Sequence, residues 1–243
     1  MFKKFHRTFN GHKTIHVQQH QYSGEEMLKQ LGIQPGAPVI VFRGGNARMN
    51  SDDAVRLERA IHDGVARAAV ELGAIVIDGG TDSGILGMLN AALGERHPHG
   101  VYIGVAPRPL THLPNQPNRN LEPLGDAHTH FILVESENWG DELAPMYALI
   151  NALAEGAPSV GILVIGGKGT EDEIGGNAGE NHRAMVIDAG ARPGDKIGLR
   201  LRSPGTVADI DVDKLAKDRD FKTVDVDLNP DKLVKRIKES LKG

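Results

Sequence analysis

The chain has 243 residues, with 28 Lys and Arg against 32 Asp and Glu, and it contains no Cys. A net charge of −4 without a long run of one sign makes nucleic acid an unexpected partner. The absence of Cys excludes a disulfide framework, a thiolate zinc site and a thiol nucleophile, and it fits a reducing, cytoplasmic compartment. No apolar stretch approaches the roughly 18 residues of a membrane span, so we expect no membrane partner.

The first 22 residues differ in character from the rest of the chain. They are polar and His-rich, carry a short predicted strand over 13–17, and lack the apolar core of a secretory signal. We expect this leader to be the least ordered part. No repeat, low-complexity segment or linker divides the remainder of the chain, so residues 23–243 are predicted to form a single domain.

Strand and helix patterns alternate along this domain. Continuous apolar runs of strand length occupy 38–43, 74–78, 101–105, 130–134, 160–165 and 184–187, with a further strand at 221–226. Apolar spacing and capping residues predict helices over 23–31, 52–72, 85–93, 142–155 and 231–241, with Gly73 ending the second and Gly94 the third. Because the strands are apolar without alternation, we predict an α/β fold: Rossmann-like and doubly wound, with a mainly parallel sheet and helices on both faces.

Three of the predicted strands end in two glycines. They give FRGGNAR (42–48), IDGGTDSGILG (77–87) and VIGGKGTEDE (164–173). Ligands of such sheets bind at the carboxyl ends of strands, where glycine lets the backbone approach a ligand and exposed helical N–H groups favour an anion. A glycine pair after a strand is also an ordinary turn. Three of them together favour a rim that binds a phosphate or nucleotide.

The second glycine turn matches no standard motif. It is not GxGxxG, no Gly-Lys-Ser/Thr comes after it as in a Walker A loop, and Ser83 lacks the GxSxG context of a nucleophile. Thr81 and Ser83 are therefore interpreted as hydroxyl donors to a phosphate or as caps of the next helix.

Several runs in order resemble a known family. AIVIDGGTDSGILGMLNAAL, VYIGVAP (101–107) and HTHFILVES (128–136), with WGDE soon after, resemble the LSDAT group of the SLOG superfamily over roughly residues 13–195. That domain lies at the N-terminus of TRPM-type channels and occurs in shorter prokaryotic proteins. The resemblance implies a Rossmannoid sensor of a nucleotide-derived ligand, with ADP-ribose-like molecules leading, no required cofactor, and an effector protein as a partner.

The resemblance also implies site residues. Carried over by position, the pocket is lined by Gly44, Gly45, Gly79, Gly80, Thr81, Ser83, Gly84, Gly104, His130, Gly166 and Gly167. Asn46, Gly169 and Thr170 of the same turns join this expected site. Arg48 either pairs with a pyrophosphate, which suits its guanidinium fork, or is a solvated surface residue. The family's Gly-Ser-Gly-Arg-like turn reads Ala189-Gly190-Ala191-Arg192 here, which leaves the role of Arg192 open.

A related group supplies the alternative function. LOG-type nucleoside 5′-monophosphate phosphoribohydrolases carry PGGxGTxxE, which IGGKGTEDE (165–173) matches except at Ile165. In those enzymes an Arg on the preceding helix acts with the motif's Glu on the N-glycosidic bond. Segment 142–155 contains no Arg or Lys, so Glu173, the catalytic candidate under this reading, lacks that cation. We favour ligand binding without turnover, with a nucleotide hydrolase as the alternative.

Other side chains carry weaker hypotheses. His128 and His130 lie on one side of an extended chain, but without an evident third ligand we predict no metal site. Glu135 and the acidic residues after it could bind ribose hydroxyls or favour the next helix start. Trp139 either stacks on a base or, more simply, packs over that helix. Rossmann-like relatives often form homo-oligomers through helices, but no apolar stripe singles out an interface.

Overall fold

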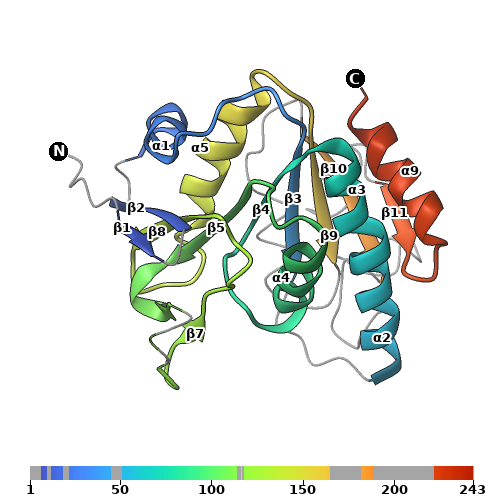
Figure 1. Ribbon diagram of the computed structural model, residues 1–243, viewed down its shortest axis with the longest axis horizontal. Helices are drawn as coiled ribbons and strands as arrows, with labels where there is room; N and C mark the ends of the chain where they lie inside the picture. The colour runs from blue at the N-terminus through green and yellow to red at the C-terminus, as the bar shows by residue number, and fades with distance from the viewer. Residues whose placement is uncertain are drawn as a thin grey trace, which may run out of the picture.

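The computed structural model describes residues 7–9, 12–18, 22–44, 51–113, 116, 118–164, 182–188 and 222–242, which form an α/β fold (Figure 1). The nine-stranded sheet has the order β1-β2-β8-β5-β4-β3-β9-β10-β11, parallel throughout except for the antiparallel pair β1–β2. Its strands are β1 (Arg7–Phe9), β2 (His12–Gln18), β3 (Val39–Gly44), β4 (Ile75–Asp78), β5 (Tyr102–Pro107), β8 (His130–Glu135), β9 (Ser159–Val164), β10 (His182–Asp188) and β11 (Lys222–Asp225). Two short strands, β6 (Thr111–His112) and β7 (Glu122–Pro123), pair separately.

Helices cover both faces of the sheet. They are α1 (Gly24–Leu31), α2 (Ser51–Ala60), the π-helical η1 (Ile61–Ala66), α3 (Arg67–Leu72), α4 (Gly84–Arg96), the 3-10 turn η2 (Arg108–Leu110), α5 (Leu143–Ala154) and α9 (Pro230–Ser240). One buried core joins the sheet to α2, η1, α3, α4 and α9, and a second joins it to α1 and α5. The predicted doubly wound, Rossmann-like architecture is confirmed. Within the described part of the chain, no helix has the length and apolarity needed to cross a membrane.

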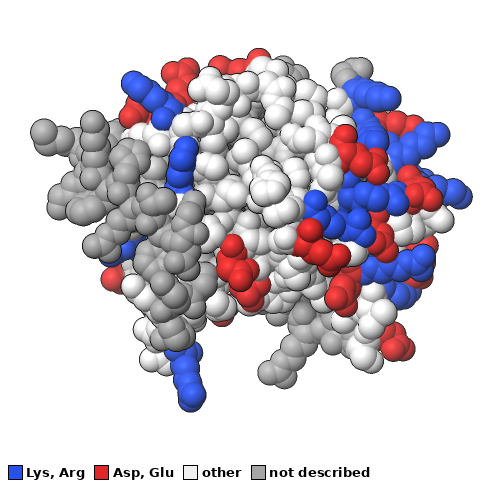
Figure 2. All heavy atoms as spheres, viewed as in Figure 1, with Lys and Arg blue, Asp and Glu red and all other residues white. Residues whose placement is uncertain are grey.

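The predicted helix over 52–72 is one rod with a π-helical middle, and α9 packs against that middle. A β-carbon at Gly64 would lie 2.4 Å from Leu233 Cδ2, so the glycine permits the close approach. Ion pairs flank the contact, joining Arg56 to Asp227, Arg67 to Asp231 and Lys238 to Glu71. Figure 2 shows the resulting mixture of both charge signs over α2, α3 and α9.

The predicted end of α4 at Gly94 is wrong, because the helix continues to Arg96. Arg96 in the last turn donates to Asp63 Oδ1 at 2.7 Å, which ties this turn to η1. A glycine within a helix costs only about 1 kcal/mol relative to alanine, so such a tertiary contact can outweigh it.

The strand order reverses between β3 and β9. From β3 the chain builds β4, β5 and β8 in one direction, and it then returns to build β9, β10 and β11 in the other. In open α/β sheets, ligands bind in the crevice outside the carboxyl ends of the strands at this switch point. The fold therefore places the ends of β3 and β9, with β4 beside them, at the expected ligand position.

Candidate functional site

The three strands that run into glycine pairs are neighbours in the sheet, in the order β4-β3-β9. Gly44 ends β3 directly opposite Val164, which ends β9, and β4 ends at Asp78 just before Gly79. Since all three strands are parallel, the glycine pairs begin at one edge. Several predicted site residues of the first and third turns lie outside the described residues: Gly45, Asn46, Arg48, Gly166, Gly167, Gly169, Thr170 and Glu173, as does Arg192.

Asp78 fixes the start of the second turn from inside the protein. Its side chain and that of His128 are fully buried, and Asp78 Oδ1 lies 2.8 Å from His128 Nε2 and accepts the Gly80 N–H at 2.7 Å. Its other oxygen accepts the hydroxyl of Tyr102, whose ring stacks on His128. Burial and the Asp78 charge raise the pKa of Tyr102 well above its usual value.

His128 lies between two polar partners in this cluster. Its Nδ1 lies 3.1 Å from the Gly125 carbonyl oxygen, while its Nε2 faces the Asp78 carboxylate. Both contacts fix the orientation of the fully buried ring beneath the second turn. Among the described residues no group of three or more His, Asp or Glu side chains could hold a metal ion.

Gly80 turns back over the middle of β5 and rests on Gly104. Gly80 has φ of +76°, a conformation that favours glycine, and a β-carbon at position 104 would lie 2.6 Å from the Gly80 Cα. The same β-carbon would approach the Phe131 ring to 2.8 Å. The structure therefore places Gly104 beneath the second turn, within the buried sheet.

Segment 122–127 holds the outer side of the second turn. The Asp82 amide donates to the Pro123 carbonyl at 2.7 Å, and the Gly125 amide donates to the Gly80 carbonyl at 3.0 Å. Thr81, itself buried, forms a β-bridge with Leu124. Sequence reasoning missed this segment, because its contacts to the turn are largely backbone hydrogen bonds.

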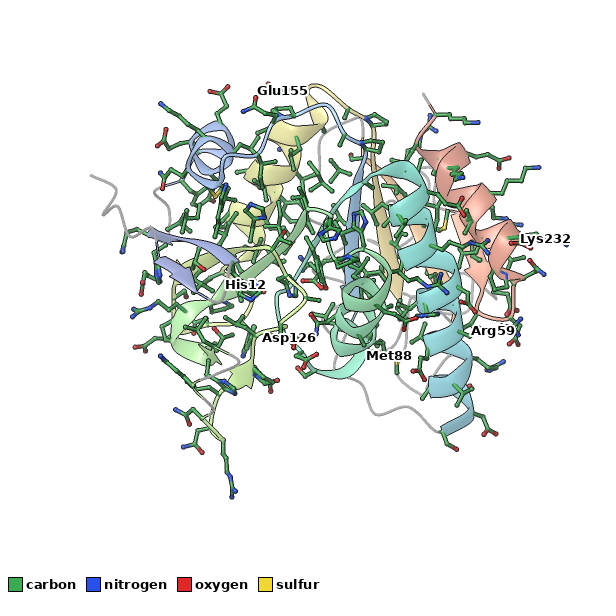
Figure 3. The ribbon with its side chains drawn as sticks, in the orientation of Figure 1. His12, Arg59, Met88, Asp126, Glu155 and Lys232 are labelled. Atoms are coloured by element: carbon green, nitrogen blue, oxygen red, sulfur yellow. The ribbon has the colours of Figure 1, made fainter. Side chains whose placement is uncertain are left out.

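Carboxylates gather where the segment meets the turn. The Ser83 hydroxyl donates to Glu122 Oε2 at 2.7 Å, although Ser83 was expected to serve a phosphate or cap the helix, and it makes no side-chain cap bond to α4. Asn90 bridges Asp82 and Asp126 at 2.9 and 3.3 Å. Figure 3 labels Asp126 beside α4, the helix that carries Asn90. Burial raises the pKa of Asp82, and the Asn90 hydrogen bond opposes that shift.

The carboxyl end of β3 lies between the first turns of two helices. A β-carbon at Gly44 would lie 2.9 Å from Ile85 Cγ2 in α4, so that side is closely packed. On the other side, Arg43 donates from Nη1 to Met146 Sδ of α5 at 2.7 Å. Sequence reasoning missed Arg43; its signal was a cation directly before Gly-Gly in an otherwise apolar strand.

Trp139 is presented to solvent by the loop from β8 to α5. Its exposed fraction is 50%, so half of its surface is open to a ligand, and both interpretations of this residue stay predictions. The loop is internally braced: Ser136 donates to Asp141, and the Gly140 amide donates to Glu142 Oε2 at 2.8 Å. Since the loop leaves the carboxyl end of β8 and leads to the α5 turn that holds Arg43, Trp139 lies on the same edge as the glycine turns.

His130 and Glu135 lie at opposite ends of β8, so the structure does not bring them together. Glu135 is at the carboxyl edge, where Arg108 donates to both of its oxygens at 3.2 Å and His16 Nδ1 lies 3.2 Å from it. His130 is at the amino edge, away from the glycine turns. Burial, with the charges of Lys13 and His12, lowers the pKa of His130 to about 4.

Comparison with known proteins places the chain in a family. Among curated proteins, no sequence matches this one. The family model described as SLOG in TRPM, prokaryote, matches residues 37–235, which begins before β3 and reaches into α9. The match spans all three glycine turns and the switch point. The chain therefore belongs to the prokaryotic SLOG-in-TRPM family.

Proposed function

We propose that this protein is a binding module that senses a nucleotide-derived ligand, ADP-ribose-like in chemistry, at the carboxyl ends of β3, β4 and β9. One observation carries the proposal: three adjacent parallel strands run into glycine pairs at the point where the strand order reverses. Membership of the SLOG-in-TRPM family supports a nucleotide-related ligand. Gly44, Gly79, Gly80 and the first turn of α4 at Gly84 form the described part of this edge.

The distribution of charge favours one orientation of the ligand along this edge. Asp82, Glu122 and Asp126 surround the outer side of the second turn, where a phosphate would be repelled. The phosphates therefore belong at the ends of β3 and β9. The exposed ring of Trp139 offers a stacking surface for a base, and the carboxylates near it suit ribose hydroxyls better than phosphate.

Binding is tested by thermal shift and calorimetric titration with AMP, ADP, ADP-ribose and ribose 5-phosphate. We expect saturable binding of at least one nucleotide, with the ligand recovered intact by chromatography. Release of ribose phosphate or free base, abolished by Glu173→Gln, would instead establish the hydrolase. A protein that none of these compounds stabilises contradicts the proposal.

The glycine variant must be chosen with the structure in mind. Gly80→Asp would disrupt the contact with Gly104, so its effect would not report on the ligand. Gly166→Asp, in the turn after β9, adds bulk and negative charge to the proposed cradle and is expected to abolish nucleotide binding. Gly156→Asp is the matched control, because a β-carbon there meets Pro35 at an ordinary 3.5 Å on the opposite edge of the sheet.

A further inference from the structure

Asp78 is a buried carboxylate at a position where the strand pattern predicts an apolar side chain. It is the last residue of β4, and every residue of that strand is buried. Side chains of a strand alternate between its faces, so Asp78 shares a face with Val76, which packs in the core beneath α4. Burying a carboxylate costs free energy unless hydrogen bonds compensate it. The bonds that Asp78 makes therefore indicate its role.

Both oxygens of Asp78 have partners inside the protein. Oδ1 accepts the Gly80 amide at 2.7 Å and lies 2.8 Å from His128 Nε2, while the Tyr102 hydroxyl donates to Oδ2. The side chains of Tyr102 and His128 are buried and stack on each other. These two residues hold the carboxylate in place, and its remaining bond goes to the backbone of the second glycine turn. Asp78 therefore connects a packed part of the core to that turn.

The second turn depends on such a support at Gly80. Its φ is +76°, a conformation that glycine adopts readily but does not by itself keep. The Gly80 carbonyl accepts the Gly125 amide at 3.0 Å, so both main-chain groups of Gly80 are bonded within the protein. Gly80 thus sets the path of the turn, and its own amide is not offered to a ligand. Thr81 and the first turn of α4, which come directly after it, take their positions from this anchor.

We infer that Asp78 is a positioning residue for the ligand: through the Gly80 amide it holds the second turn in the conformation that binds. The inference rests on the proposed function and adds to it a buried residue that the ligand does not touch. A site that is fixed before the ligand arrives avoids the entropic cost of ordering a loop on binding. Nucleotide affinity therefore depends on the acceptor that Asp78 offers to Gly80.

The test titrates AMP, ADP and ADP-ribose into matched variants by calorimetry. Asp78→Leu removes the acceptor and keeps a side chain of similar size, whereas Asp78→Asn removes the charge but keeps an oxygen for the Gly80 amide. We expect Asp78→Leu to weaken nucleotide binding at least about 10-fold and Asp78→Asn to stay within about 3-fold of wild type. Because both variants lose the carboxylate, the loss of charge cannot explain a difference between them.

Hydrogen exchange without ligand measures the turn itself. The Gly80 amide should exchange at least about 10-fold faster in Asp78→Leu than in Asp78→Asn. Tyr102→Phe is a milder change that removes only the hydroxyl on Oδ2, and it should speed this exchange and weaken binding about 3-fold. It carries the test if Asp78→Leu does not fold, and unchanged exchange and affinity in Tyr102→Phe would then contradict the inference.

A stability control separates positioning from a general loss of structure. Leu233→Ala removes a buried side chain of α9 that packs against Gly64, far from the second turn in the fold, and should change nucleotide affinity less than about 2-fold. An affinity loss in Leu233→Ala as large as that in Asp78→Leu overturns the positioning role. Equal affinities of Asp78→Leu and Asp78→Asn also overturn it and leave the binding function standing. A wild-type protein that binds none of the nucleotides overturns the proposed function and this inference with it.

Discussion

Gly80 and Gly104 touch backbone to backbone, one in the turn after β4 and the other within β5. Either residue with a side chain would enter the space of the other, since a β-carbon at Gly80 would lie 3.2 Å from the Gly104 Cα and one at Gly104 would lie 2.6 Å from the Gly80 Cα. The path of the second turn is therefore set by a glycine from a different strand, well beyond the turn in the sequence.

Gly104→Ala is expected to destabilise the protein by about 1–3 kcal/mol, because the added methyl group must displace the Gly80 turn or the Phe131 ring. Urea unfolding measures the change. Gly156→Ala serves as the control and should stay within about 0.5 kcal/mol of wild type. Equal unfolding midpoints for Gly104→Ala and wild type would contradict the contact.

Asp78→Asn should destabilise the protein by about 3–5 kcal/mol, because it breaks a fully buried contact in which Asp78 Oδ1 lies 2.8 Å from His128 Nε2. His128→Gln should destabilise the protein by a similar amount, since it removes the partner of the buried Asp78 side chain. The double variant is expected to lose clearly less stability than the sum of the losses of the two single variants. Additive losses in urea unfolding would show that the two side chains do not act as a pair. Asp126→Asn, which changes an exposed carboxylate nearby, is the control.

His130 should make stability depend on pH. Its folded pKa is about 4, below the ordinary 6.5, so between these values the unfolded chain binds a proton that the folded protein does not. The stabilisation is complete above about pH 6.5 and is lost as the pH falls toward 4. His130→Gln should therefore lose less stability than wild type between about pH 7 and 4.5, whereas His99→Gln, at an exposed position, should behave as wild type. Parallel pH profiles of His130→Gln and wild type would refute this assignment.

Trp139 is the only tryptophan, so its fluorescence reports directly on the edge where we place the ligand. Saturating AMP should quench it, whereas ribose 5-phosphate should bind without quenching, because only the former carries a base that stacks. Trp139→Leu should weaken AMP about 10-fold, and Trp139→Phe should retain most of the affinity. An unchanged spectrum in a sample that calorimetry shows to be saturated with AMP would place the base elsewhere.

The strands and the glycine pairs after them could be predicted, because a continuous apolar run and an adjoining Gly-Gly are local features. That β4, β3 and β9 are neighbours could not, since strand order depends on how the crossover helices pack and no single strand encodes it. Segment 122–127 escaped prediction for a related reason: it holds the turn mainly through backbone groups, which every residue type supplies.

His130 and Arg43 each carried a local signal in the sequence. His130 is the first residue of its apolar run, so in a parallel sheet it had to lie at the amino edge, opposite the glycine turns. Arg43 interrupts an apolar run one residue before a glycine pair, which in a buried strand already indicates a special role. The contact between Arg43 and Met146, by contrast, depends on where α5 docks and had no local signature.

The packing of Leu233 against Gly64 has a consequence for how the protein matures. During synthesis α9 emerges after every other described element, yet it covers the middle of the long helix that comes after β3. Until α9 has formed, the surface beside Gly64 that Leu233 covers stays open to water and to other nascent chains. Any shortened form that ends before Pro230 should accordingly be prone to aggregate.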